Sequence, residues 1–211
     1  MSSISIVIST YGDEGWAELA WSRAYPSTIG QGAEEVVVQH YPKLAIGPAR
    51  NLTAKKAKGD FLIHLDADDE LDAGYVQAMR EAIEGLPPEH EPSRTLFQPA
   101  VRYIRKGRMA DPVLIPVKDL RHDNYLVVGT MVSRHLFEEV GGFSDYPHGF
   151  EDWSLWAKCW KSGARIQPVT HAFYHAHINP KSKHREMWRN RRLQVETHLR
   201  VQAELFPEGV T

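Results

Sequence analysis

The sequence predicts an α/β fold: a single Rossmann-like domain with a central, mostly parallel sheet, flanking helices and a long C-terminal helix. Short runs rich in branched apolar residues at 4–9, 35–39 and 61–65 have the length and composition of buried strands. Helical patterns at 16–25 and 48–58 separate these runs. Parallel strands need such crossover helices, so strand and helix alternate as in an α/β sheet.

The composition is that of one ordinary globular domain. Hydrophobic residues make up 42% of 211 residues, and 25 basic side chains face 27 acidic ones, for a net charge of -2. The apolar fraction excludes disorder as the main state, and the missing basic excess argues against a nucleic-acid partner. The single cysteine, Cys159, excludes an internal disulfide. No apolar run is long enough for a transmembrane segment and no secretory signal is visible, so we expect a cytoplasmic protein.

The first half, residues 1–70, is expected to bind a nucleotide. Thr10–Asp13 ends the first strand, a turn at Gly30–Gly32 precedes the second, and Pro48 suits the first turn of the helix that follows. Gly59 and Asp60 then lead into the third strand. Ligands of such sheets bind beyond the carboxyl ends of the strands. We therefore expect the site at 10–13 and 66–69.

The second half is less regular, and residues 95–180 are expected to form a substrate-specific half of the same domain, 1–211. The predicted helices are 72–84, 134–140, 152–162 and 183–204, and the predicted strands are 95–104, a short one near Val113, 125–133 with a break at Gly129, and 172–177. Trp153, Trp156 and Trp160 share one helix face, which indicates a core-facing helix.

An acidic cluster, Asp66-Ala67-Asp68-Asp69-Glu70, follows the third strand. Carboxylates at i and i+2 in a turn can converge on a hard divalent cation and on ribose hydroxyls. Such a cation neutralises a diphosphate that becomes a leaving group. The alternative is a solvated acidic turn that caps the helix starting near Asp72.

A second acidic pair, Glu151-Asp152, lies between Phe150 and Trp153. A carboxylate beside apolar rings is desolvated, which raises its pKa and strengthens it as a base. The alternative is simple capping of the following helix, which the helix dipole also favours.

Together these segments resemble a family 2 glycosyltransferase of the GT-A fold, over roughly residues 4–177. The resemblance rests on five motifs in order: Ile6–Tyr11, Ala49–Asn51, Gly59–Asp69, Gly141–Asp145 and Phe150–Trp156. It implies metal-dependent transfer of a sugar from a nucleotide-diphospho-sugar to an acceptor hydroxyl, with inversion. A retaining transferase on the same fold and a catalytically silent nucleotide-sugar-binding domain are the alternatives.

The resemblance also implies a role for each motif residue. Thr10 and Tyr11 would line the nucleotide pocket, and Arg50 would approach the nucleotide or its diphosphate. Asp66, with Ala67 beside it, would face the ribose or the metal. Asp68 would bind Mn²⁺ or Mg²⁺ at the diphosphate. Glu151 and Asp152 would lie on the acceptor side, with Asp152 as general base.

The partners are only partly specified. The resemblance favours a UDP-sugar as donor, while the acceptor stays open between a saccharide, a protein and a lipid-linked molecule. The family usually has an acidic pair after its second strand, but here the chain reads Val38-Gln39-His40. The base is therefore not fixed, and Gln39 is the candidate for a hydrogen bond to it. Gly129 is a candidate donor-sugar contact, because glycine permits close approach to the backbone, or else a bulge.

Three histidines, His171, His175 and His177, occur in the last predicted strand. A regular strand would place them on one face. Neutral imidazole is a good ligand for Mn²⁺, and the resemblance favours His175 and His177 as metal ligands. The alternative is a row of polar histidines on the strand surface.

The C-terminal helix is predicted to be basic. Its cations are Lys181, Lys183, Arg185, Arg189, Arg191, Arg192 and Arg200. Such a helix can contact a diphosphate, an acidic partner or an anionic membrane surface. The alternative is a solvated helix that packs through Trp188, Leu193, Val195 and Leu199.

Overall fold

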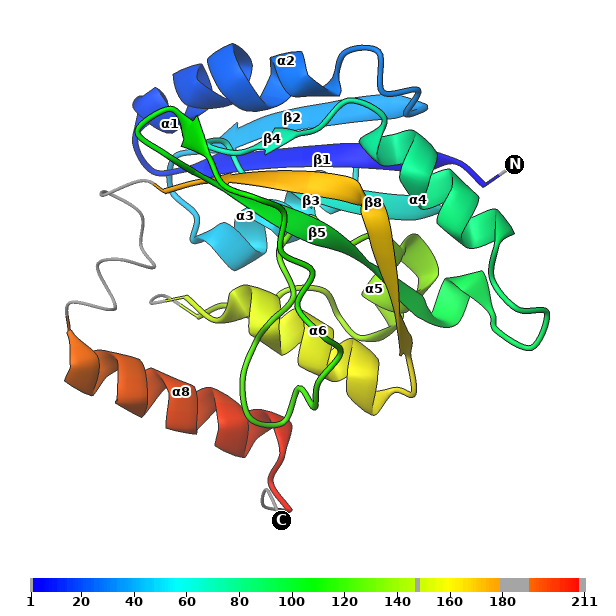
Figure 1. Cartoon of the computed structure of the whole chain (residues 1–211). Helices are drawn as coiled ribbons and strands as arrows, with labels where there is room; N and C mark the ends of the chain where they lie inside the picture. Colours follow the sequence, from blue (N-terminus) through cyan, green and yellow to red (C-terminus); the bar gives the residue numbers. More distant parts are fainter. Residues whose placement is uncertain (1, 147–148, 179–189, 209–211) are drawn as a thin grey trace.

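The computed structural model describes residues 2–146, 149–178 and 190–208, and it has the predicted α/β architecture (Figure 1). The helices are α1 (Glu14–Leu19), α2 (Tyr25–Thr28), α3 (Ile46–Ala54), α4 (Tyr75–Glu84), α5 (Arg134–Glu139), α6 (Glu151–Lys161) and α8 (Arg191–Leu205), with a π-helical turn η1 (Ala20–Ala24) and a 3-10 turn η2 (Pro92–Arg94). The strands are β1 (Ile4–Tyr11), β2 (Glu35–Tyr41), β3 (Phe61–Leu65), β4 (Glu70–Leu71), β5 (Thr95–Arg105), β6 (Arg108–Met109), β7 (Val132–Ser133) and β8 (Arg165–His177). The helices predicted at 48–58, 72–84, 134–140 and 152–162 are confirmed within a few residues at their ends.

The first sheet has the order β2-β1-β3-β7. β1 pairs in parallel with both β2 and β3, and Ile6 lies opposite Val36 and Ile63. The chain therefore crosses from β1 outward to β2, then back over β1 to β3. Right-handed crossovers in opposite directions place their helices on opposite faces, so α1 and α2 cover one face and α3 the other (Figure 1).

The second sheet has the order β4-β8-β5-β6. β5 and β8 are parallel, and the short edge strands β4 and β6 are antiparallel to their neighbours. The domain thus has a second group of paired strands beside the sheet that contains β1, β2 and β3. An antiparallel bridge between Phe97 and Met131 connects β5 to the segment that precedes β7. The short strand expected near Val113 is a single bridge to Val101.

The predicted strand at 125–133 is wrong for residues 125–130. Only Val132 and Ser133 pair with β3, as β7. The preceding residues form an irregular segment in which Leu126 and Val128 are buried, and the Thr130 N–H donates to the Val127 carbonyl in a turn. Burial of an irregular segment gives the same apolar composition as a strand, so the sequence pattern does not separate the two.

The late strand is longer than predicted and contains an irregularity. Pro99 lies opposite Val169, whereas Ala100 lies opposite Phe173. Residues 170–172 therefore have no partner on β5, and the alternation of side chains is interrupted there. His171 is exposed and separated from His175 and His177 by this bulge, so the expectation of three histidines on one regular face is wrong.

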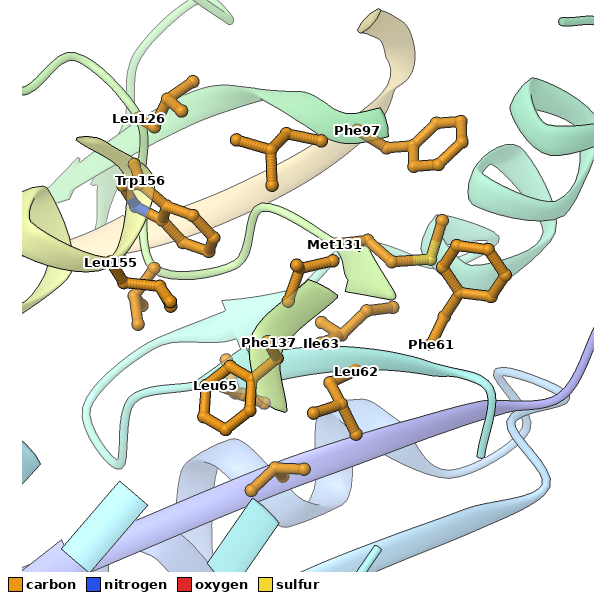
Figure 2. Packing of buried hydrophobic residues seen from close by; sticks show 14 of the residues in the cluster. Phe61, Leu62, Ile63, Leu65, Phe97, Leu126, Met131, Phe137, Leu155 and Trp156 are labelled. Atoms are coloured by element: carbon orange, nitrogen blue, oxygen red, sulfur yellow. The ribbon is translucent and has the colours of Figure 1, made fainter. Parts of the chain in front are cut away.

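The hydrophobic core lies between the two sheets and α6. Figure 2 shows side chains of β3, β5, α5 and α6 pointing toward one another, with Met131 between Phe97 and β3. Trp153 and Trp156 of α6 are fully buried, which confirms the core-facing helix, and Cys159 is buried on the same helix. Burying each of the leucine, isoleucine, methionine and phenylalanine side chains of this core contributes about 1.5–3 kcal/mol of hydrophobic free energy.

The helix α8 lies beside α6, on the side away from β1 and β2 (Figure 1). It begins at Arg191, and the expected helical start at 183 lies outside the described residues, as do Trp188 and the cations from Lys181 to Arg189. Val201 and Leu205 are buried, whereas Val195 and Leu199 are exposed, contrary to the packing expected of them. Among the helices described here, none is both long and apolar enough to cross a bilayer.

Candidate active site

A cavity of about 1120 Å³ opens at the carboxyl ends of β1 and β3. Its lining comes from the end of β1, from the residues that follow β3, from the start of α6, from the segment at 122–128 and from one face of α8. The cavity therefore lies where parallel strands of an α/β sheet direct a ligand. Its lining includes these predicted site residues: Thr10, Tyr11, Arg50, Asp66, Ala67, Asp68, Glu151 and Asp152.

Arg50 of α3 joins the two acidic motifs. Its buried guanidinium donates to Asp66 at 2.5 Å and to Glu151 at 2.7 Å, and it lies over the Phe143 ring at 5.0 Å from the centroid. Burial lowers the pKa of Arg50, but the carboxylates of Asp66 and Glu151 outweigh burial and hold that pKa above the ordinary arginine value. Arg50 is therefore a fixed positive charge between the cluster after β3 and the pair at the start of α6. The expected approach of Arg50 to a diphosphate stays a prediction.

Asp152 lies in the first turn of α6, where the chain enters the helix through an unusual backbone. Phe150 has φ of 69°, a left-handed conformation that costs a residue with a β-carbon about 1–3 kcal/mol. After this turn of the backbone, Glu151 and Asp152 both line the cavity. Burial, and then the charge of Glu151, raise the pKa of Asp152 to about 7. A carboxylate with this pKa is half ionised near neutral pH, which suits a general base.

Tyr11, at the end of β1, and Asp69, after β3, also line the cavity. Burial and the nearby Glu151 raise the pKa of Tyr11 to about 12, so its hydroxyl keeps its proton and can donate. Asp69 is buried, and it accepts from the Tyr174 hydroxyl at 2.8 Å and from the His177 N–H at 2.7 Å. Asp69 thus ties the acidic turn to β8, a structural role that its place in the motif does not reveal.

His175 and His177 are not among the residues that line this cavity. His175 Nε2 lies 3.3 Å from Asp72 Oδ1, and His177 Nε2 lies 2.5 Å from Glu70 Oε2. These contacts attach β8 to the edge strand β4 and to the residue after it. Within the described parts of the chain, no three His, Cys, Asp or Glu side chains are arranged to hold a metal ion. The role of His175 and His177 as metal ligands stays a prediction.

Gly129 and Gln39 also lie outside the cavity lining. A β-carbon on Gly129 would come within 2.3 Å of the Tyr174 ring, so packing alone requires glycine there. The Gln39 amide donates to the Val38 carbonyl at 2.6 Å, and Lys56 donates to its oxygen. The Thr10 hydroxyl lies 2.9 Å from His40 Nδ1 and 3.4 Å from the backbone carbonyl oxygen of Gln39.

Several cavity residues were not predicted. Among them are His122, Asp123, Asn124, Trp16 and Ile46, together with Gln194, Val195, His198 and Leu199 of α8, whereas Arg191 was expected only as one of the cations of that helix. The α8 residues have the spacing of one helix face, which is the signal that was available. His198 on this face stacks on Trp153 with ring centroids 4.8 Å apart, so α8 packs next to the residue that follows Asp152. The loop residues carry no periodic signal.

Comparison with known proteins agrees with this geometry. The family model for glycosyl transferase family 2 matches residues 33–108. A Bacillus subtilis (strain 168) protein named "Uncharacterized glycosyltransferase YwdF" is 28% identical over 187 residues, which cover 75% of this chain and 68% of that protein.

Solved structures share the fold at low sequence identity. S. aureus TarS 1-349 has a TM-score of 0.61 at 16% identity, over 83% of this chain and 60% of that one. The same protein in complex with UDP has a TM-score of 0.62 at 16% identity, over 96% of this chain and 65% of that one.

GalNAc-T7 with UDP, GalNAc and Mn²⁺ has a TM-score of 0.63 at 17% identity, over 86% of this chain and 44% of that one. The chain therefore spans less than two thirds of the length of these structures. The matched segment, the glycosyltransferase relative and the shared fold together support the resemblance to a family 2 glycosyltransferase with the GT-A fold.

Proposed function

We propose that this chain transfers a sugar from a nucleotide-diphospho-sugar to an acceptor hydroxyl with inversion, and that Asp152 is the general base. The observation that carries the proposal is the position of Asp152. It lines the same cavity as Asp66 and Asp68, and its pKa is raised to about 7. A base and a leaving-group site in one cavity can hold a sugar carbon between them, as a displacement from opposite sides requires.

The donor belongs on the wall formed by Thr10, Tyr11, Asp66, Ala67 and Asp68. The neighbouring structures hold UDP in TarS and UDP with Mn²⁺ in GalNAc-T7, which favours a UDP-sugar. Asp66 and Asp68 offer the hard oxygen ligands that Mn²⁺ and Mg²⁺ take, with phosphate oxygens and water for the remaining positions. Such a cation would supply charge neutralisation for the departing diphosphate.

The proposed reaction is a single displacement. The acceptor hydroxyl gives its proton to Asp152, and its oxygen forms a bond to the anomeric carbon of the donor sugar. The bond from that carbon to the diphosphate oxygen breaks on the opposite face, and the electron pair leaves with the nucleoside diphosphate. Glu151 is engaged by Arg50 at 2.7 Å, so Asp152 is the carboxylate assigned to the proton. A saccharide, a protein and a lipid-linked molecule all remain acceptor classes.

The anomeric configuration of the product tests this proposal. We expect proton NMR of the first sugar released from an α-linked donor, with water as acceptor, to show the β anomer before mutarotation. The α anomer would instead support a retaining transferase. Nucleotide sugars that are neither bound nor cleaved would overturn the proposed transfer.

A further inference from the structure

Asn124, in the segment between β6 and β7, contacts the carboxylate of Asp152. Its side-chain Nδ2 donates to Asp152 Oδ2 at 2.9 Å, and its Oδ1 accepts from the Leu126 N–H at 3.0 Å. A backbone N–H only donates and a carboxylate accepts, so these two partners fix the orientation of the amide. Each end of the Asn124 side chain is therefore matched to its partner.

The other oxygen of Asp152 is held as well. Its Oδ1 accepts from the backbone N–H of Trp153 at 2.7 Å, one of the unpaired donors in the first turn of α6. The carboxylate plane is thus set by one donor on each oxygen. Each oxygen keeps a further lone pair, and Asp152 lines the cavity.

The segment that carries Asn124 is itself anchored on two helices. The Trp153 ring N–H donates to the Leu120 carbonyl at 2.8 Å, and the Gln202 amide of α8 donates to the Arg121 carbonyl at 3.0 Å. Leu120 is fully buried. These contacts fix Asn124 relative to α6, so its amide is preorganised for the carboxylate.

We propose that Asn124 is a positioning residue that aims the Asp152 carboxylate for proton transfer, an inference that rests on the proposed function. A donor to a carboxylate favours its ionised form, so Asn124 opposes the effect of burial and keeps Asp152 available as a base near neutral pH. It also removes the rotation that would turn the reactive lone pair away from the acceptor.

The test compares Asn124→Ala and Asn124→Asp with the wild type. Tyr125→Phe is the matched control, because it removes a hydrogen bond from the Tyr125 hydroxyl to the Lys118 carbonyl in the same segment and does not touch Asp152. Nucleotide release is measured with Mn²⁺ and water as acceptor, using the donor cleaved fastest among UDP-GlcNAc, UDP-glucose, GDP-mannose and dTDP-glucose. The pH dependence of kcat and KM is recorded for each variant.

We expect Asn124→Ala to lower kcat about ten- to a hundredfold with KM for the donor unchanged, and to move the rising limb of the pH profile to higher pH. Asn124→Asp should move it further, because a like charge disfavours ionisation of Asp152. Tyr125→Phe should match the wild type. A fall in activity without a pH shift in either variant would reduce Asn124 to a structural residue and overturn the proposal.

Carboxyl-carbon NMR supplies a readout that needs no turnover. The Asp152 signal is assigned by its loss in Asp152→Asn, and its pKa is expected to rise in Asn124→Ala and not in Tyr125→Phe. An active wild type with an unchanged pKa and kcat in Asn124→Ala overturns the Asn124 inference alone. A wild type that cleaves none of the four donors overturns both this inference and the proposed function.

Discussion

At the scale of single residues, Asp152 controls the expected pH dependence. Burial and the charge of Glu151 raise its pKa to about 7, and a base works in its ionised form. We expect kcat/KM to rise about tenfold per pH unit below that value and to level off above it. Asp152→Asn should lower kcat about a hundredfold or more and leave donor binding intact. Steady-state kinetics and donor titration measure both, and lost donor binding in Asp152→Asn would count against its role as a base.

His64 on β3 gives a second prediction, for stability. Its ring is fully buried between Phe137 and Phe143, without a hydrogen-bond partner for either nitrogen among the described residues. Burial, with a contribution from Arg50, lowers the pKa of His64 to about 3. Below pH ~6.5 the His64 side chain binds a proton in the unfolded chain but not in the folded chain. The free energy of unfolding therefore falls as the pH falls from about 6.5 toward the folded-state pKa.

Replacement of His64 by leucine should remove this sensitivity. Between pH 7.5 and 5.0 the wild type should lose about 2 kcal/mol more unfolding free energy than His64→Leu. Urea denaturation of both proteins at the two pH values measures the difference. Buried carboxylates such as Asp152 and Asp69 titrate in both proteins, so their contributions cancel. Equal losses in the two proteins would show that His64 is not held neutral.

At the scale of elements, Arg50 connects α3 to the turn after β3 and to the start of α6. Removing one partner of a buried ion pair leaves an uncompensated charge, so Arg50→Met should cost about 3–5 kcal/mol of stability. Adding Glu151→Gln should restore part of that loss, because one of the stranded charges is then gone. Chemical denaturation of the single and double variants measures this. A double variant no more stable than Arg50→Met would contradict the assigned pairing.

The elements also show what local patterns predict. β1 and β3 were predictable because they are buried on both faces and read as continuous apolar runs. The Glu151-Asp152 pair was predictable from its position before an amphipathic helix. Asn124 was not, because it lies in an irregular segment and its partner is 28 residues away in sequence. The bulge at 170–172 was also invisible, because it depends on the register against β5.

At the scale of the whole molecule, the proposed donor site lies at the ends of β1 and β3, which are neighbours in the first sheet. Any nucleotide that binds only the folded chain should raise its melting temperature. We expect UDP with Mn²⁺ to do so more than GDP, dTDP or CDP, and EDTA to abolish the shift. At a hundred times Kd the gain is about 2.7 kcal/mol.

Asp68→Ala is the matched variant for this measurement, and it should lose the Mn²⁺-dependent part of the shift. A shift unaffected by this substitution would exclude Asp68 from the metal site.

The division of the strands into two sheets was not predictable from the sequence, because it depends on which edges pair. The predicted donor side did not require it, since β1, β2 and β3 all belong to the first sheet.

One guanidinium, that of Arg50, contacts both Asp66 and Glu151, so a change of charge at one acidic motif affects the other. The charge of Asp66 contributes to the raised pKa of Asp152, and Arg50 opposes it. A cation that neutralises Asp66 therefore increases the acidity of Asp152, and ionisation of Asp152 must strengthen the binding of that cation by the same free energy. Binding of a metal-bound donor at Asp66 and ionisation of Asp152 are therefore expected to favour each other.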